Sequence, residues 1–376
     1  MSRLKQLIQE LCPDGVEFYS LGELELLGKI QLGRGNIISK KDMQECPGDY
    51  PVYSSAATNN GMIGKYGKYM FEDERLSWSI DGGGRFFYRN NEKYSITNVG
   101  GWLKVLDDSA FLTRYLYHVL SAEWSKKTFD YIHKAHPSVI RDEYVIPIPP
   151  IEVQREIVRI LDNFTELTAE LTAELELRKK QYSELSYQLL IKKNNSKLHF
   201  VKDLCELSKG KTPIQKAEPG DYPLVVTTSE RKSCKTYQYD TAAVCIPLVS
   251  SRGHGVASLN HVYYQEGKFA LGNILCAVVP TDENVLSAKY LYFYFECTKD
   301  YTLVPLMKGG ANVSMRIPDI EKVKIPVPDI ETQHNIVSKL EILDEYCNIT
   351  LSAEIEANKK RYEYYRDKLL DFKEVK

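Results

Sequence analysis

Residues 146–154 read IPIPPIEVQ and residues 325–333 read IPVPDIETQ, and each box leads directly into a long helical pattern. Proline holds the residue before it in an extended conformation, so each box marks the exit from a domain and the beginning of a helix. We expect these helices over residues 151–195 and 329–376. The repeated box predicts that two halves of the chain share one plan.

The repeat extends to both sides of the boxes. AELELRKKQY, which begins at Ala173, recurs 180 residues later as AEIEANKKRY from Ala353. Upstream, GDYPVY from Gly48 recurs 172 residues later as GDYPLV from Gly220. The two halves therefore resemble each other before the helices as well as along them.

Two mixed domains are expected before the helices, over residues 1–150 and 196–328. Both contain short β-branched and aromatic runs separated by Gly, Pro, Asn and Asp, which is typical of strands and turns. Each also contains one helical patch, TRYLYHVLSAEW in the first and AKYLYFYFEC in the second. We therefore expect two similar α+β domains.

Apolar residues on the first helix follow alternating steps of four and three, the heptad pattern of a coiled-coil seam. The second helix has one extra residue near Cys347, which predicts a stutter, a local change of phase that leaves the seam intact. The expected seam consists of Ile157, Leu161, Phe164, Leu171, Leu175, Tyr182, Leu185 and Leu189 on the first helix and Ile336, Leu340, Leu343, Leu351, Ile355, Tyr362, Tyr365 and Leu369 on the second.

Linker lengths predict how the helices pair. The first helix ends within a few residues of the second domain, and that domain leads directly into the second helix. Because the two ends of a domain are commonly close together, the second helix is expected to run back antiparallel to the first. The predicted fold is two α+β domains separated by an antiparallel coiled coil with a pseudo-twofold axis.

Composition excludes several classes of protein. A net charge of -2 over 376 residues excludes a strongly basic chain that binds polyanions through bulk charge. No apolar run is long enough for a membrane span, and charged residues near the start argue against a secretory leader, so we expect a cytoplasmic protein. The eight cysteines form no C-x-x-C pair and are interpreted as reduced thiols.

The organisation resembles that of the specificity subunits of type I restriction-modification systems. The resemblance is carried by KQLIQELCPDGVEFYSLGEL at residues 5–24, by the two IP[IV]P-x-IE-x-Q boxes and by the diverged domains before them. GKTP at residues 210–213 matches the family's GGTP-like turn, whereas the first domain has LGRGN at residues 32–36. The match covers the whole chain.

The resemblance implies two target-recognition domains, each reading one half of a bipartite site in double-stranded DNA. It also implies that the helices are conserved spacers that dock two methyltransferase (M) subunits, and that restriction and translocation (R) subunits join through the complex. S-adenosylmethionine, ATP and Mg are then expected on the partner subunits, with no cofactor in this chain.

The residues themselves point to no catalytic or metal site. The methyltransferase box [DNS]-P-P-[YFW] is missing, and the P-loop-like Gly210, Lys211 and Thr212 have Cys205 where the first glycine of that motif belongs. His133 and His136 have no carboxylate pattern beside them and are interpreted as a loop pair. We therefore expect a non-catalytic subunit without metal.

DNA contacts are expected in the loops of the domains, because the spacer helices carry net charges of -1 and -3. Lys and Arg contact phosphates, while Arg and Asn also read base edges; a solvated surface charge is the alternative for each residue. The candidates are Arg34, Lys40, Lys41, Asn59, Asn60, Lys65, Lys68, Arg85 and Arg89 in the first domain and Lys209, Lys211, Arg231, Lys232, Lys235, Arg252, His254, Lys308, Asn312 and Arg316 in the second.

Aromatic residues beside these candidates have two interpretations, stacking at the contact surface and core packing, of which core packing is favoured. They are Tyr66, Tyr69, Trp78, Tyr237 and Tyr239. Apolar residues outside the seam suggest a further contact surface on the helices. These are Val158, Ile160, Leu167, Leu177, Leu190, Val337, Ile342 and Ile349.

Three other functions remain open at this point. One is the specificity subunit of a related system that cuts on both sides of its site. Another is a stand-alone DNA methyltransferase or nuclease with an unrecognised site. The third is a scaffold whose domains bind proteins; steep salt dependence of binding would distinguish DNA from such partners.

Overall fold

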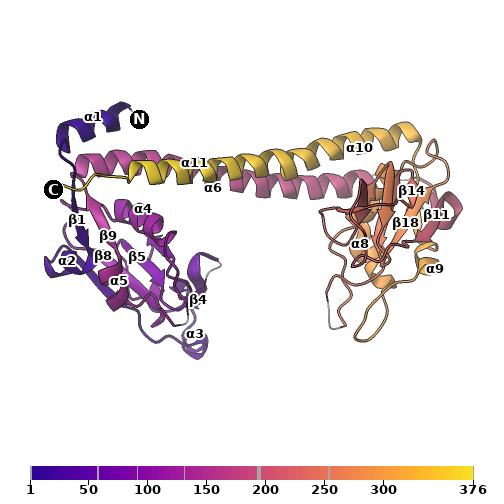
Figure 1. Ribbon diagram of the computed structural model, residues 1–376. Helices are drawn as coiled ribbons and strands as arrows, with labels where there is room; N and C mark the ends of the chain where they lie inside the picture. The colour runs from indigo at the N-terminus through magenta and orange to yellow at the C-terminus, as the bar shows by residue number, and fades with distance from the viewer. Residues whose placement is uncertain are drawn as a thin grey trace. The chain divides into compact units, whose positions relative to one another are not determined.

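The computed structural model describes residues 2–56, 59–90, 92–130, 132–192, 196–252 and 255–375. The chain forms two compact units. Unit 1 comprises Met1–Leu171 with Ile355–Lys376, and unit 2 comprises Thr172–Glu354. Each unit contains one of the expected domains together with a portion of both long helices (Figure 1).

The domain of unit 1 contains an antiparallel four-stranded sheet in the order β2-β8-β5-β6 and a three-stranded sheet in the order β4-β3-β7. In the smaller sheet, β3 runs parallel to β7 and antiparallel to β4. The strands are β2 (Ile30–Arg34), β3 (Tyr50–Tyr53), β4 (Met62–Tyr66), β5 (Arg75–Ser79), β6 (Phe86–Arg89), β7 (Ser95–Ile96) and β8 (Gly100–Val105), and the helices are α2 (Leu21–Leu26), α3 (Lys40–Glu45), α4 (Thr113–Trp124) and α5 (Pro137–Glu143).

The domain of unit 2 repeats this topology with one additional edge strand, β14, in two four-stranded sheets of the orders β11-β18-β15-β16 and β13-β12-β17-β14. As in the three-stranded sheet of unit 1, one strand pair of the second sheet, β12 with β17, is parallel. The strands are β11 (Cys205–Lys209), β12 (Tyr222–Val225), β13 (Lys232–Cys234), β14 (Tyr239–Asp240), β15 (Ala243–Pro247), β16 (Tyr263–Gln265), β17 (Lys268–Leu271) and β18 (Leu275–Pro280), and the helices are α7 (Val201–Leu204), α8 (Ala288–Thr302), a 3-10 turn (Val304–Leu306) and α9 (Ile317–Ile320).

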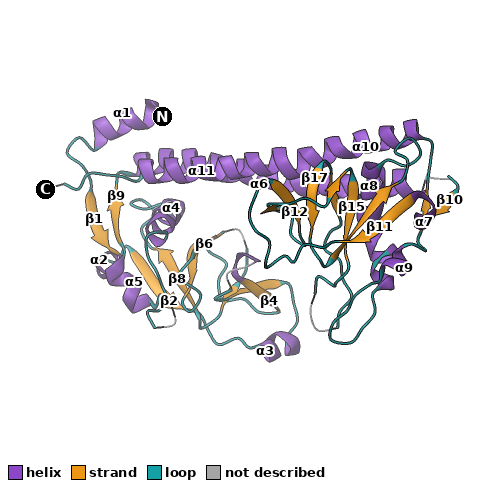
Figure 2. Ribbon diagram, turned by 45° about the vertical axis from the view of Figure 1, so that its right-hand side comes forward, coloured by secondary structure: helices purple, strands orange, loops and turns teal. Residues whose placement is uncertain are grey.

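A two-stranded sheet joins the entry and exit segments of each domain (Figure 2). In unit 1, β1 (Glu17–Ser20) pairs antiparallel with β9 (Val145–Ile148), which contains the first proline box. In unit 2, β10 (Leu198–Phe200) pairs in the same way with β19 (Lys324–Pro326). The two ends of each domain therefore lie side by side, as the linker argument assumed.

The long helices form where the sequence predicts them. Helix α6 (Ile151–Tyr187) continues as a π-helical turn (Gln188–Lys192). The second helix consists of α10 (Ile330–Glu345), a π-helical turn (Tyr346–Leu351) and α11 (Ser352–Leu369). The expected second spacer is thus helical only to Leu369, and the residues that follow leave the helix.

Within each unit the two helices run antiparallel. In unit 1 the rings of Phe164 and Tyr365 stack with centroids 5.4 Å apart, and Asn358 donates to Thr168, farther along α6. In unit 2 the Tyr346 hydroxyl donates to Glu174 at 3.2 Å. Most of the expected seam residues are buried or half-buried, so the heptad interpretation is confirmed.

The stutter takes the form of a π-helical turn. A π turn accommodates one additional residue within an α-helix, and the turn Tyr346–Leu351 contains Cys347, around which the sequence pattern is out of phase. Cys347 and Leu351 are 2% and 1% exposed. The extra residue is therefore absorbed locally, and the seam remains buried on both sides of it.

The two ends of the chain meet in unit 1. After α11, the Lys373 carbonyl accepts a hydrogen bond from the Val16 N–H at 2.8 Å, and the Val375 N–H donates to the Val16 carbonyl at 3.0 Å. Helix α1 (Ser2–Leu11) precedes this bridge and contributes the buried Leu4 to the core of unit 1. In the part of the chain that the structure describes, no helix is both long and apolar enough to cross a membrane.

Candidate nucleic-acid interface

Several candidates of the first domain are exposed at the end of unit 1 farthest from the long helices, on or near α3 and β4 (Figures 1 and 2). Lys40 and Lys41 begin α3, Lys65 lies on β4, and Lys68 follows that strand. The Lys65 ammonium is 3.3 Å from the Asp49 carboxylate. Exposed ion pairs contribute little stability, so these cations are accessible to an anionic partner.

Arg34 and Arg85 lie apart from that group. The Arg34 guanidinium donates to the Asn98 carbonyl at 3.1 and 2.6 Å and so ties the end of β2 to the loop before β8. Arg85 borders a groove of about 370 Å³ that is also lined by Tyr362 and Glu363 of α11. Arg85 is therefore directed toward the helices rather than toward α3.

The prediction that Arg89 contacts DNA is wrong, because the side chain of Arg89 is only 1% exposed. Its guanidinium lies 3.4 Å from the centre of the Tyr53 ring, and Nε donates to the Ser77 hydroxyl at 2.9 Å. Burial lowers the pKa of Arg89. In this conformation the side chain is a core residue and cannot contact a duplex.

Arg89 instead holds the turn that carries Asn59 and Asn60. These residues have φ values of 50° and 53°, in the left-handed region that asparagine tolerates better than most residues. The Arg89 Nη2 donates to the Asn60 carbonyl at 2.8 Å. Both asparagines are exposed, so the buried arginine fixes a turn whose side chains face solvent.

In the second domain, three lysines line one groove of about 710 Å³. Lys211 and Lys216 approach it from the GKTP turn and the residues after it, and Lys235 approaches it from the end of β13. Tyr237, 46% exposed, forms part of the wall. Lys209 and Lys232 are exposed on the flanking strands β11 and β13 and do not line the groove.

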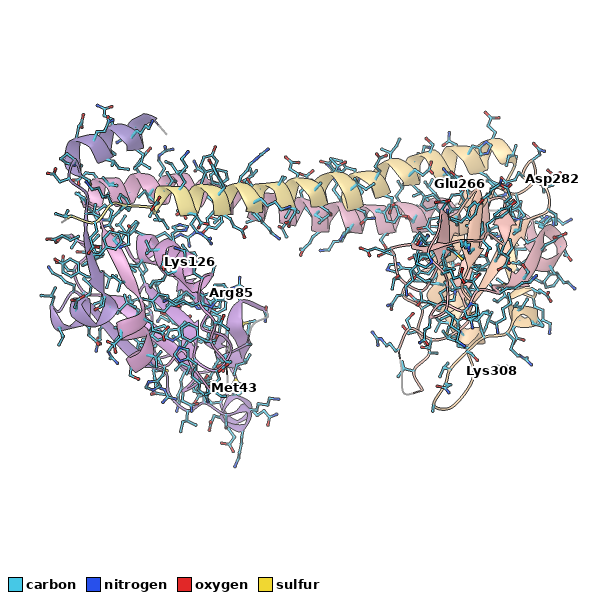
Figure 3. All side chains as sticks on the ribbon, in the orientation of Figure 1. Met43, Arg85, Lys126, Glu266, Asp282 and Lys308 are labelled. Carbon is cyan, nitrogen blue, oxygen red and sulfur yellow. The ribbon has the colours of Figure 1, made fainter. Side chains whose placement is uncertain are left out.

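A second group lies on two adjoining loops of unit 2. The Ser250 N–H donates to the Val313 carbonyl at 2.9 Å, which joins the loop bearing Arg252 to the loop bearing Lys308 and Asn312. Arg252, Lys308 and Asn312 are exposed, and Lys308 lies in the long loop at the end of the domain away from α10 (Figure 3). His254 is outside the described residues.

Two further candidates already have partners within the domain. Arg231 donates from Nε to the Gln265 side chain at 3.0 Å and from Nη2 to the Tyr264 carbonyl at 3.2 Å. Arg316 forms an ion pair with Asp319 at 3.0 Å, although its side chain remains exposed. The structure therefore divides the candidates of the second domain between the groove, the two loops and these internal contacts.

The turns LGRGN and GKTP occupy equivalent positions in the two domains. The Gly35 N–H donates to the Gly100 carbonyl, and the Gly210 N–H donates to the Leu275 carbonyl, at 3.0 and 2.9 Å. A Cβ atom at Gly35 would be 2.0 Å from a carbonyl oxygen, and one at Gly210 would be 2.2 Å from another. The same close backbone approach thus requires glycine in both domains.

A buried glutamine from the first proline box connects α6 to its domain. The Gln154 Oε1 accepts from the Leu112 N–H at 3.0 Å, and Nε2 donates to the carbonyls of Ala110 and Pro149, both at 2.8 Å. The side chain is fully buried. One amide therefore bonds the segment that begins α4 and the box that begins α6.

Gln333 of the second box makes the same set of bonds in unit 2. Its Oε1 accepts from the Ser287 N–H at 2.9 Å, and its Nε2 donates to the carbonyls of Val285 and Pro328 at 2.8 Å. We call this arrangement the glutamine clamp. The prediction from sequence missed it, although the shared Q at the end of both boxes was the available signal.

Ion pairs reinforce the clamp at equivalent positions. Arg114 of α4 contacts Asp162 of α6 at 2.8 Å, and Lys289 of α8 contacts Glu341 of α10 at 2.7 Å. Buried polar groups with satisfied hydrogen bonds fix the orientation of the elements they join. Each domain is therefore fixed to its long helix by the same two interactions, a glutamine clamp and an ion pair.

Unit 1 adds a buried histidine to this interface. His118 of α4 contacts Asp162 through Nε2 and the Tyr362 hydroxyl through Nδ1, both at 3.0 Å. Burial lowers the pKa of His118, although the hydrogen bond to Asp162 opposes the shift. The side chain is thus neutral at neutral pH and acts as a packing and hydrogen-bonding group.

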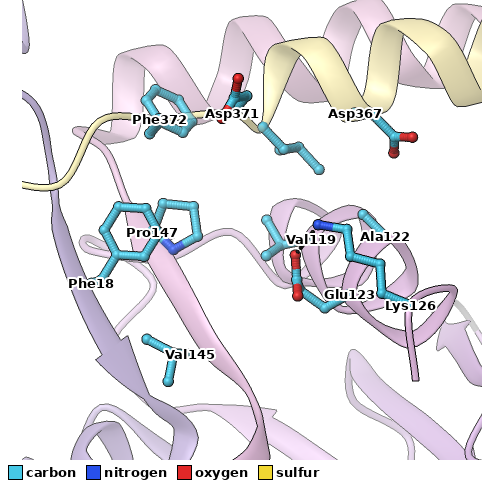
Figure 4. Close-up of a pocket in the computed structure, with 11 residues that line it drawn as sticks. Phe18, Val119, Ala122, Glu123, Lys126, Val145, Pro147, Asp367, Asp371 and Phe372 are labelled. Atoms are coloured by element: carbon cyan, nitrogen blue, oxygen red, sulfur yellow. Dashed lines mark hydrogen bonds and ion pairs between the residues drawn. The ribbon is translucent and has the colours of Figure 1, made fainter. Parts of the chain in front are cut away.

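A groove of about 480 Å³ lies between the β1–β9 sheet, α4 and the end of α11 (Figure 4). Its walls include the apolar Phe18 and Val145, the three carboxylates of Glu123, Asp367 and Asp371, and one ammonium group, that of Lys126. An acidic surface of this kind repels phosphate groups. The groove therefore does not belong to the nucleic-acid interface.

The apolar residues outside the seam divide into two groups. Val158 and Ile160 pack on the core of unit 1, and Leu190 and Val337 are buried in the core of unit 2, so these four are not a free surface. The others remain exposed on the helices. They are Leu167, Leu177, Ile342 and Ile349.

The described residues contain no group of three or more His, Cys, Asp or Glu side chains arranged to hold a metal ion. All eight cysteines are free thiols. Burial raises the pKa of Cys205, Cys245 and Cys276 to about 12, which is the opposite of activation as a nucleophile.

Comparisons with known proteins agree with this organisation. The model of the type I restriction modification DNA specificity domain matches residues 13–177 and again 194–358. A putative type I specificity subunit of Mycoplasma pneumoniae is 29% identical over 91% of this chain and 95% of its own length. The EcoR124I/EcoR124II specificity subunit of Escherichia coli is 33% identical over 71% of this chain and 72% of its own.

The fold is similar to that of solved proteins as well. The crystal structure of a type I restriction-modification S subunit from M. genitalium aligns with a TM-score of 0.59 at 14% identity, covering 95% of this chain and 96% of that one. A chain from a structural study of type I complex assembly aligns at 0.54 and 13% identity, covering 95% and 98%. The chain belongs to the specificity subunits of type I restriction-modification systems, non-catalytic subunits with two target-recognition domains.

Proposed function

We propose that this subunit reads a bipartite DNA site, with one half-site recognised by each domain and the distance between them set by the paired helices. The observation that carries the proposal is a duplicated scaffold with different loops. Both domains have one topology and one glutamine clamp, whereas their exposed polar residues differ. Different loops imply that the two half-sites need not form a palindrome.

The proposal extends to partners and cofactors. Two M subunits dock on the helices, where Leu167, Leu177, Ile342 and Ile349 supply exposed apolar area. R subunits join through that complex. S-adenosylmethionine, ATP and Mg bind to those partners in the cytoplasm, and this chain contributes recognition only.

The distribution of charge supports a dependence on partners. The second domain carries a net charge of +3 and the first -1, while the helical segments are acidic. Few cations mean few phosphate contacts, and phosphate contacts supply much of the affinity for DNA. The isolated chain should therefore bind its site modestly, and docked M subunits should strengthen that binding.

Selection from random-sequence duplexes tests the proposal. The full chain, alone and with its methyltransferase partner, is expected to enrich two short motifs separated by a spacer of constant length. Log-linear weakening of binding with salt is expected for DNA and not for a protein scaffold. Absence of any enriched motif in both samples would contradict the proposed function.

A further inference from the structure

Each domain exposes the same small group of tyrosine and lysine side chains. In unit 1, the ring of Tyr69 packs against Tyr50 with centroids 5.1 Å apart, and the Lys93 Nζ lies 4.5 Å from its centre. In unit 2, Tyr237 packs against Tyr222 at 4.9 Å, and the Lys268 Nζ lies 5.1 Å from its centre. We call these groups the tyrosine–lysine pairs.

The sheet registers show that the pairs are equivalent. In the β3–β4 ladder Tyr50 pairs with Tyr66, and Tyr69 comes three residues later. In the β12–β13 ladder Tyr222 pairs with Cys234, and Tyr237 comes three residues later. On the other side of β3, strand β7 begins its parallel pairing at Ser95, two residues after Lys93. On the other side of β12, strand β17 begins its parallel pairing at Ala270, two residues after Lys268. The correspondence is therefore one of position in the fold.

Neither pair is needed to fill a core. Tyr69 is 41% exposed and Tyr237 is 46% exposed, and both lysines are exposed. Nearby positions differ between the domains, since Gly67 and Lys68 on one side correspond to Lys235 and Thr236 on the other. A surface feature kept by both domains while its surroundings change is suited to a contact that does not depend on base sequence.

We propose that Tyr69 with Lys93, and Tyr237 with Lys268, are equivalent contacts of the two domains to the sugar-phosphate backbone of DNA. This inference rests on the proposed function as a reader of duplex DNA. Phosphate contacts fix the position of a protein on the duplex without reading its sequence. Two domains that read different half-sites still need the same placement on the backbone.

The geometry favours a phosphate over a base. A base stacks on an open aromatic face, but each tyrosine ring has a second tyrosine against it and a lysine above it. In unit 1 the Lys93 ammonium is 3.3 Å from the Tyr69 hydroxyl. An ammonium and a hydroxyl side by side offer two donors to one phosphate oxygen pair.

The surrounding charges leave the lysines accessible. Lys93 is 3.5 Å from the Glu72 carboxylate, and both side chains are largely exposed. Such an exposed ion pair contributes little stability and is weakened by salt, so exchange of Glu72 for a phosphate costs little. In unit 2, Tyr237 borders the groove lined by Lys211, Lys216 and Lys235, which adds positive potential beside the pair.

The test is the salt dependence of DNA binding by the full chain carrying Lys93→Gln and Lys268→Gln together. Each phosphate contact contributes about 0.9 to the slope of log K against log salt, so the slope should fall by about 1.8 on duplexes with and without the selected site. The enriched motifs should not change. The matched control is Lys180→Gln with Lys359→Gln, two exposed lysines of the long helices, which should keep the original slope.

Tyr69→Phe with Tyr237→Phe provides a second measurement that preserves the ring packing. Loss of the hydroxyls should weaken binding several-fold, and by the same factor for every duplex. An unchanged slope in the lysine variant, or an altered base preference in either variant, would overturn the inference. If the unaltered chain bound duplexes without any preference, the proposed function would fail, yet the slopes would still show whether these pairs contact phosphates.

Discussion

Burial separates scaffold residues from contact residues among side chains of the same kind. Arg89 was expected at the DNA surface, but its guanidinium packs on Tyr53 and supports the Asn59–Asn60 turn from within. Gln154 is fully buried and makes three hydrogen bonds. The bonds that Arg89 donates to Ser77 and Asn60, and those of Gln154, all go to groups of the same domain. Both residues therefore position neighbouring segments rather than touch a ligand.

His118 makes the stability of unit 1 dependent on pH. Because burial lowers its pKa in the folded protein, the unfolded chain binds more protons below pH about 6.5, and the free energy of unfolding should fall as pH drops below that value. The slope for one group is at most about 1.4 kcal/mol per pH unit. The carboxylate of Asp162, whose pKa is lowered, titrates below this window.

The equivalent position in unit 2 is Phe293, which is buried. His118→Phe should therefore flatten the pH dependence of guanidinium unfolding below pH about 6.5. An equally steep pH dependence in the His118 variant would show that other groups are responsible.

At the scale of elements, the two halves obtain the same local structure from different residues. Strands β1 and β10 share little sequence, yet each pairs with its proline box because the box supplies extended backbone beside it. The second long helix accommodates an extra residue in its internal π turn, whereas the first has its π turn at its end, at Gln188–Lys192. Interruptions of this kind preserve a seam when they fall between buried positions.

Deletion of Thr350 tests that interpretation of the π turn. Without this exposed residue, the step from Cys347 to Leu351 becomes three, and the seam of the second helix becomes a regular heptad. The π turn should revert to α-helix, and the free energy of unfolding should change by less than about 1 kcal/mol.

Deletion of Ala357, which is exposed within α11, is the matched control. It rotates the following turns away from α6 and exposes buried seam residues such as Leu369, each worth roughly 1.5–3 kcal/mol. Denaturant unfolding measures the free energy of unfolding of the two deletion variants, and circular dichroism measures their helix content. Equal destabilisation by both would contradict the interpretation of the π turn as an absorbed insertion.

At the scale of the whole molecule, backbone hydrogen bonds in unit 1 join a segment near the N-terminus to the segment that follows the second long helix. Val16, just before β1, bonds to Lys373 and Val375, which follow the second long helix. Both long helices also pass from one unit into the other. We therefore expect a change in the length of these helices to change the spacing between the half-sites that the two domains read.

Insertion of one heptad into each helix tests the proposed spacing role. Suitable positions are after Leu171 in α6 and after Ile355 in α11, because insertion near Leu351 would disturb the π turn. Seven residues add about 10 Å to a helix, so the selected spacer should lengthen by at most about three base pairs while both half-site motifs stay unchanged. New half-site motifs with the original spacer would contradict the spacing role.

Much of the architecture was determined by sequence alone. The proline boxes, heptad steps and repeats predict the duplicated plan and the long helices, the β-branched and aromatic runs with one helical patch each predict the α+β domains, and the short linkers predict antiparallel pairing. Even the phase change at Cys347 was visible, because periodicity in a helix depends only on residue spacing. The family resemblance followed from the same boxes and was confirmed by the comparisons.

Tertiary structure decided which side chains are available for contact. Sequence offered 19 candidate contact residues of similar chemistry. Folding buried Arg89, bonded Arg231 to Gln265 and Tyr264, and left Arg316, Lys65, Lys235 and Lys308 exposed. It also brought together Tyr69 and Lys93, which are 24 residues apart, and the glutamine clamp with its carbonyls. Local spacing dictates backbone periodicity, but exposure and proximity depend on long-range pairing that no single stretch of sequence encodes.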